Sequence, residues 1–86
     1  MSSQLHDFAM EFATGGLSAE EFVDPFMEKW RRERDSGGLT DDPGEVSERL
    51  SSIFCLADLY NPEADREGYE LDESGLRREI RRIMKL

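Results

Sequence analysis

Apolar residues recur every three or four positions in four separate stretches of this chain, and that spacing places them on one face of an α-helix. The four stripes are Leu5, Phe8, Ala9 and Phe12; Phe22, Val23, Phe26, Met27 and Trp30; Val46, Leu50, Ile53, Phe54 and Ala57; and Leu76, Ile80, Ile83 and Met84. No stretch alternates apolar and polar residues as a strand does. Since 86 residues suffice for only one core, the sequence predicts a single all-α domain, residues 1–86, folded as an antiparallel four-helix bundle.

Residues that favour turns separate the four stretches. Two glycines follow the first stretch, residues 35–38 close the second, residues 41–44 precede the third, and Asn61-Pro62 follows it. Ser18, with Glu21 three residues later, forms the capping-box pattern that opens a helix. Acidic residues 72 and 73 are expected in the first turn of the fourth helix. The four helices should therefore be joined by loops that begin and end at these positions.

Pro25 lies inside the second apolar stretch, where it removes one backbone N–H donor. The sequence leaves two alternatives at this point. Either the helix kinks at Pro25, or a new helix begins there with Asp24 as its N-cap and Pro25 as its first helical residue.

Charge is unevenly distributed along the chain. It carries 20 Asp and Glu against 11 Lys and Arg, a net charge of −9. Such a protein repels phosphate, so direct binding to nucleic acid or to an anionic membrane is disfavoured and a basic partner is expected. Residues 58 to 73 hold seven acids and one cation, whereas residues 77 to 86 hold five cations and one acid. The alternative is that the acidity serves only solubility.

A calcium loop is the first alternative for the acidic stretch. Glu63, Asp65 and Glu67 alternate, and Gly68 follows where an EF-hand loop has its glycine. The pattern then fails, because the twelfth position is Ser74 instead of a bidentate Glu. We therefore expect neither a metal nor another cofactor.

Residues for catalysis are sparse. His6 is the only histidine and is expected on the surface, while Cys55, the only cysteine, lies beside Ile53 and Phe54 and is expected to be buried or half-buried. We therefore expect a protein that is not an enzyme. One cysteine forms no internal disulfide, and no segment approaches the roughly 20 apolar residues of a membrane span, so the expected location is the cytoplasm.

Two arginine clusters raise the alternative of a nucleic-acid site. Trp30 is followed by three arginines, but its ring continues the stripe of Phe22 and Phe26, which favours a place in the core. Arginines near the end of a helix are also favoured by its dipole. Arg78 and Arg82 are expected to form an exposed ridge that pairs with acids of a neighbouring helix.

The run PEADREGYELDESGL, residues 62–76, followed by a basic amphipathic helix, resembles the colicin D-type immunity proteins, a bacterial self-protective family. The start of the second helix, with Ala19, Glu21 and Phe22, is also similar to that family. The resemblance covers most of the chain, is most specific in residues 62–76, and is weak in the first helix and in residues 36–46. Pro25 departs from the family's pattern.

The resemblance implies a four-helix bacterial protein that binds the C-terminal nuclease domain of a toxin made by the same bacterium. In that family the toxin cuts transfer RNA, and the immunity protein covers its basic active-site cleft with carboxylates placed where RNA phosphates would lie. The acidic positions that it implies for this contact are Asp58, Glu63 and Asp65, with Glu67 and Glu70 as weaker candidates. Tyr69 is expected to anchor the acidic stretch to the bundle instead of contacting the partner.

Two other functions stay open at this point. One is an immunity protein of a contact-dependent inhibition system, which would share the fold and the mechanism but neutralise a toxin delivered by a neighbouring cell. The other is an unrelated acidic adaptor that imitates nucleic acid and binds a basic regulator. The product of the adjacent gene would distinguish these alternatives.

Overall fold

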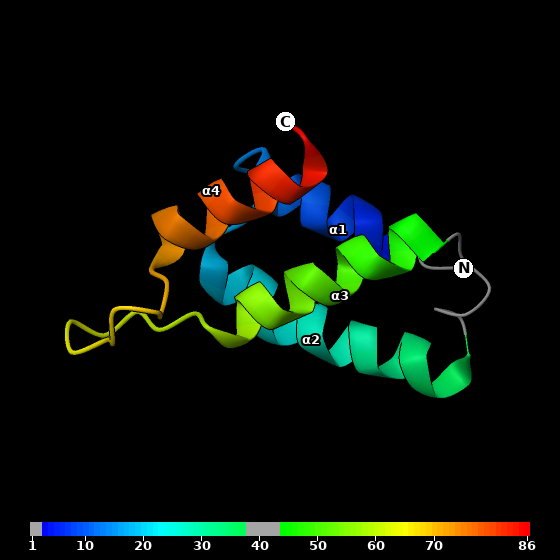
Figure 1. Cartoon of the computed structure of the whole chain (residues 1–86), viewed down its shortest axis with the longest axis horizontal. Coiled ribbons are helices and arrows are strands. Elements are labelled where there is room, and N and C mark those ends of the chain that lie inside the picture. The colour runs from blue at the N-terminus through cyan, green and yellow to red at the C-terminus, as the bar shows by residue number, and fades with distance from the viewer. Residues whose placement is uncertain (1–2, 38–43) are drawn as a thin grey trace.

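The computed structural model describes residues 3–37 and 44–86. They form four helices: α1 (Ser3–Ala13), α2 (Ala19–Ser36), α3 (Gly44–Asp58) and α4 (Glu73–Met84). Successive helices run in opposite directions, and both α1 and α3 pack against α2 and α4 (Figure 1). Within the described ranges the one β-type pairing is an isolated bridge between Tyr60 and Leu71. The predicted all-α four-helix bundle is confirmed, whereas most of the turn predicted at residues 41–44 lies outside the described residues.

The core is built from the apolar stripes of all four helices. Its largest fully buried side chains are Leu5, Phe12, Phe22, Phe26, Leu50, Ile53, Leu76 and Ile80. Phe22 lies at the centre of an aromatic stack, with its ring centroid 4.4 Å from that of Phe12, 5.0 Å from Phe26 and 5.5 Å from Phe8. Each phenylalanine ring buries a large apolar area, which matters in so short a chain. This stack therefore joins α1 to α2.

Helix α2 continues through Pro25 from Ala19 to Ser36, so the alternative of a new helix beginning after Asp24 is wrong. A proline inside a helix costs about 3 kcal/mol because one hydrogen bond is lost and its ring crowds the preceding turn. Phe22 and Phe26, on either side of Pro25, are both fully buried. Their burial offsets the cost and keeps the helix in one piece.

The predicted capping box at the start of α2 is present. The Ser18 hydroxyl accepts from the Glu21 backbone N–H at 3.2 Å, and Glu21 Oε1 accepts from the Ser18 backbone N–H at 3.0 Å. The bond from the Ser18 backbone, followed by the contact with its side chain, lowers the pKa of Glu21 below its usual value of 4.5. The folded helix therefore favours the ionised form of Glu21.

We expect Glu21→Gln to flatten the acid dependence of thermal stability. A carboxyl whose pKa is lowered by folding adds stability above its unfolded pKa, and this is lost as the pH falls through the folded pKa. Glutamine still accepts the Ser18 bond but has no charge to lose. Melting followed by circular dichroism from about pH 6 to about pH 3 measures the effect. Glu20→Gln, in the same turn, is the control; identical slopes for both variants would contradict the prediction.

Helix α4 is joined to the end of α1 by two arginines. Arg77 Nε donates to the Phe12 carbonyl at 3.0 Å, and Arg81 Nη1 donates to the Ala13 carbonyl at 3.0 Å. The last carbonyls of a helix lack intrahelical donors and carry the negative end of its dipole, so cationic donors stabilise them. The predicted pairing of Arg82 with a neighbouring helix is wrong, because Arg82 pairs with Glu79 of α4 itself, at 3.3 Å.

The expectation that Cys55 is at least half-buried is also wrong, because its side chain is exposed. Neighbouring residues of a helix point about 100° apart, so adjacency to Ile53 and Phe54 does not place Cys55 on their face. His6 is half-buried, with Nδ1 4.0 Å from the Asp7 carboxylate. The ring of Trp30 packs on that of Phe54 with centroids 4.3 Å apart, so its predicted contact with the core is confirmed.

Candidate functional site: the acidic loop between α3 and α4

The segment that joins α3 to α4 extends beyond the ends of both helices, as Figure 1 shows. We call residues 59–72 the acidic loop. Its two ends are held together at the base, where the Asn61 N–H donates to the Leu71 carbonyl and the Leu71 N–H donates to the Leu59 carbonyl, both at 2.8 Å. Tyr60 and Leu71 also pack against the core. The loop therefore projects from a fixed base.

Tyr60, and not Tyr69, anchors this loop. Tyr60 continues the spacing of Ile53 and Ala57 along α3, and that spacing is the signal in the sequence that would have identified it. Burial, followed by the negative charge of Glu20, Glu73 and Asp72, raises the pKa of the Tyr60 phenol above its usual 10.0. The side chain of Tyr69 is 68% exposed, so the expectation that it packs onto the bundle is wrong.

Asn61 and Glu70 fix the shape of the loop from inside. The Asn61 side chain accepts from the Glu63 backbone N–H at 2.9 Å and donates to Glu70 Oε1 at 3.3 Å. The same Glu70 oxygen accepts from the Glu67 backbone N–H at 2.8 Å. Glu70 is half-buried. Its carboxylate is therefore already used within the loop.

Arg66, the one cation of the loop, joins it to α4. Arg66 Nη1 donates to the Glu63 carbonyl at 2.8 Å, and Nη2 lies 3.5 Å from Asp72 Oδ2. Asp72 is also the N-cap of α4, because its Oδ1 accepts from the Gly75 N–H at 2.7 Å. This arrangement satisfies an otherwise unpaired helix donor. The one positive charge of the loop therefore pairs with Asp72, a carboxylate that also caps α4.

Glu73 connects α4 to the start of α2. Its Oε1 accepts from the Ala19 backbone N–H at 2.6 Å, and its Oε2 lies 3.8 Å from Arg77 Nη1. Ala19 is the first residue of α2, so this bond joins two elements that are far apart in the sequence. Glu73 therefore holds α4 against the start of α2, whereas Glu70 and Asp72 hold the acidic loop in shape.

The remaining four acids of this region face solvent. They are Asp58, the last residue of α3, and Glu63, Asp65 and Glu67 of the loop. Among the described residues, none of these four carboxylates has a hydrogen-bond or ion-pair partner. The structure thus divides the seven acids, which the sequence presents as equivalent, into three that hold the fold and four that project from it. We call these four the free carboxylates.

The described part of the chain contains no group of three or more His, Cys, Asp or Glu side chains arranged to hold a metal ion. None of its helices combines the length and the apolar content needed to cross a membrane. Chemically, the region can accept hydrogen bonds from another molecule. Its free carboxylates are exposed at the end of α3 and on the projecting loop, and they have no donor among the described residues. Such groups suit Lys and Arg donors of a second molecule.

Comparison with known proteins identifies the family. The model of the family described as bacterial self-protective colicin-like immunity matches residues 1–86. No curated protein matches the chain significantly.

Proposed function

The chain belongs to the bacterial self-protective colicin-like immunity family, and from this premise we propose that it inhibits a nuclease toxin by covering the toxin's basic active-site cleft. Membership of the family supports an immunity protein against a colicin-type toxin, an inhibitor and not an enzyme. The nuclease activity of the toxin, with transfer RNA as its substrate, is the part that we add. It follows from the resemblance of residues 62–76 to colicin D-type immunity proteins and from the chemistry of the loop.

The observation that carries the proposal is the set of free carboxylates: Asp58 at the end of α3, and Glu63, Asp65 and Glu67 on the projecting loop. A nuclease cleft holds phosphates with Lys, Arg and His donors, and carboxylates accept the same charge-assisted bonds. Because these acids have no partner among the described residues, binding breaks no internal ion pair. The loop is also fixed at its base, which reduces the entropy lost on binding.

The contacts within the loop suggest different roles for the five acids proposed from the sequence. Asp58, Glu63 and Asp65 would make the main contacts with the toxin, with Glu67 beside them. Glu70 would act by holding the loop in shape, since its carboxylate accepts from Asn61 and from the Glu67 backbone. The free carboxylates would then take the place of RNA phosphates, on a support that Glu70 maintains.

The net charge of −9 gives the proposal a kinetic consequence. Opposite charges on protein and toxin would steer their encounter and raise the association rate at low salt. Added salt screens exposed charges beyond about 8 Å at physiological ionic strength. The association rate should therefore fall as salt is added.

The function is tested by titrating the purified protein into the toxin domain that the adjacent gene is expected to encode, while following the cleavage of transfer RNA. We expect cleavage to stop at one molecule of this protein per toxin domain, and co-expression to restore cell survival with intact transfer RNA. An acidic protein of unrelated fold with the same net charge is the control and should leave cleavage unchanged. Cleavage that continues in the presence of well-folded protein would contradict the proposal for that toxin and favour an acidic adaptor.

A further inference from the structure

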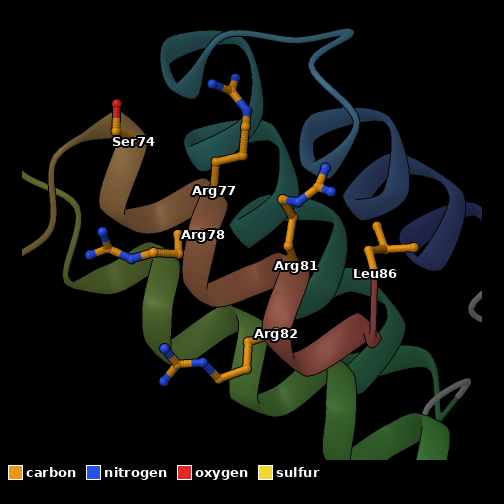
Figure 2. Close-up of a pocket in the computed structure, with 6 residues that line it drawn as sticks. All are labelled: Ser74, Arg77, Arg78, Arg81, Arg82 and Leu86. Carbon is orange, nitrogen blue, oxygen red and sulfur yellow. The ribbon is translucent and has the colours of Figure 1, made fainter.

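A groove lined by arginines lies on α4, on a protein whose overall charge is strongly negative. It has a volume of about 560 Å³ and is lined by Ser74, Arg77, Arg78, Arg81, Arg82 and Leu86. Figure 2 shows the four arginines along α4, with Ser74 in its first turn and Leu86 just beyond its C-terminal end. We call this surface the arginine groove.

The four arginines of the groove differ in how far they are already bound. Arg77 and Arg81 donate to α1 carbonyls and are held in place. Arg82 is 72% exposed and its pair with Glu79 is a surface pair, which contributes little to stability. Arg78 is exposed and has no hydrogen bond or ion pair to another described residue. Two cations, Arg78 and Arg82, are therefore available.

These two arginines are spaced to act together. Residues four apart on a helix are neighbours on its surface, about 5–6 Å apart at Cβ. In Figure 2 both side chains extend from the same side of α4, away from Arg77 and Arg81. Two guanidinium groups in this arrangement match a pair of carboxylates, each of which accepts two parallel bonds from one arginine.

The surroundings of the groove favour an acidic protein segment over a nucleic acid. A net charge of −9 repels a polyanion such as RNA, whose charge is continuous along its length. Leu86, 51% exposed, lies at one end of the groove and offers an apolar contact. The aliphatic stems of the arginines offer more. A segment with a few carboxylates and an apolar side chain matches all of these features.

We propose that the arginine groove binds an acidic, partly apolar segment of the same toxin domain whose basic cleft the acidic loop covers. The inference rests on the proposed function. Ser74 is the second residue of α4 and follows the acidic loop almost directly, so the two surfaces adjoin. Helix α4 has 12 residues, a length of about 18 Å, well within the reach of a partner that covers a standard interface.

Because the two adjoining surfaces have opposite charges, they favour one orientation of the bound toxin over the reverse orientation. A toxin placed the wrong way round would bring its acids to the loop and its cations to the groove, and both contacts would then be repulsive. The groove would thus fix the orientation in which the loop enters the cleft. It would also exclude basic proteins that lack the acidic segment.

The test is the double variant Arg78→Glu, Arg82→Glu, with Arg31→Glu, Arg32→Glu as its matched control. Both pairs are exposed, both change the net charge equally, and in both pairs one arginine has a surface partner on its own helix. Arg31 also lies over the Phe54 ring, 5.6 Å from its centroid, so the stability of both variants is compared. Affinity for the adjacent nuclease domain is measured by calorimetry, and helix content by circular dichroism. We expect the groove variant to weaken binding about tenfold or more, mainly through faster dissociation, and the control to change it less than about threefold.

Each other outcome has a separate meaning. Equal effects of the two variants would overturn the groove as a contact while leaving the proposed function intact. No binding by the unaltered protein would contradict the proposed function itself, and the inference with it. A short single-stranded RNA that the unaltered protein binds and the groove variant does not would overturn the protein partner in favour of a nucleic acid. If charge reversal unfolds the chain, Arg78→Gln, Arg82→Gln takes its place, with a smaller loss expected.

Discussion

Neutralising three of the free carboxylates together, as Asp58→Asn, Glu63→Gln and Asp65→Asn, should weaken binding to the toxin domain about 1000-fold or more. Truncating a charged side chain that is desolvated against its partner costs about 2–5 kcal/mol of binding free energy, because the partner's charge is left buried and unpaired. A 1000-fold change is about 4 kcal/mol, which is less than the sum of three such losses because neighbouring contacts are not additive. Calorimetry with the adjacent nuclease domain measures it.

The control removes the same number of charges from helix surfaces away from the loop. Asp7→Asn, Asp24→Asn and Glu48→Gln are suitable, since all three side chains are exposed on α1, α2 and α3. We expect this control to lower mainly the association rate at low salt and to leave the dissociation rate unchanged. If both triple variants lose affinity equally, the effect is one of net charge alone, and the free carboxylates do not form a site.

The variant Tyr69→Ala should weaken toxin binding about 30-fold without lowering the stability of the protein. The ring is 68% exposed within the acidic loop, where burial against a partner would make it a strong contact. Exposed tyrosines at the centre of an interface commonly contribute about 2 kcal/mol or more, which corresponds to about 30-fold in affinity. Affinity is measured as above, and stability by urea unfolding.

Tyr60→Ala provides the contrast, because Tyr60 packs against the core at the base of the loop. It should lower the free energy of unfolding, whereas Tyr69→Ala should not. Tyr69→Phe keeps the ring and should retain most of the affinity. Unchanged binding by Tyr69→Ala would place Tyr69 outside the interface and leave the contact to the free carboxylates.

The sequence was informative wherever a structure depends on neighbours along the chain. The spacing of the apolar residues predicted the four helices and the stripes that supply the core, because a helix brings residues three and four apart onto one face. The capping box of Ser18 and Glu21 was identified because its two bonds connect residues three apart. The density of acids near residue 65 identified the region of the candidate site.

Local pattern was insufficient wherever two residues meet across the fold. In the sequence Glu73 looks like its acidic neighbours, but in the structure it accepts from the Ala19 backbone N–H. Arg77 likewise looks like Arg78, but it donates to the carbonyls of Phe12 and Leu17. Such contacts depend on which backbone groups a helix end leaves unpaired, and that is decided by how the helices pack. The same reason explains why Tyr60 anchors the loop while its counterpart nine positions later faces solvent.

The sequence by itself therefore determined that the chain forms four helices, that its acids gather before the last one and that cations follow them. These properties depend on composition and on spacing of a few residues. Only the tertiary structure decided which acids and arginines are used inside the fold and which are left free, because a polar group is satisfied by partners that packing brings to it. The free carboxylates and the arginine groove are what remains once those internal bonds are made.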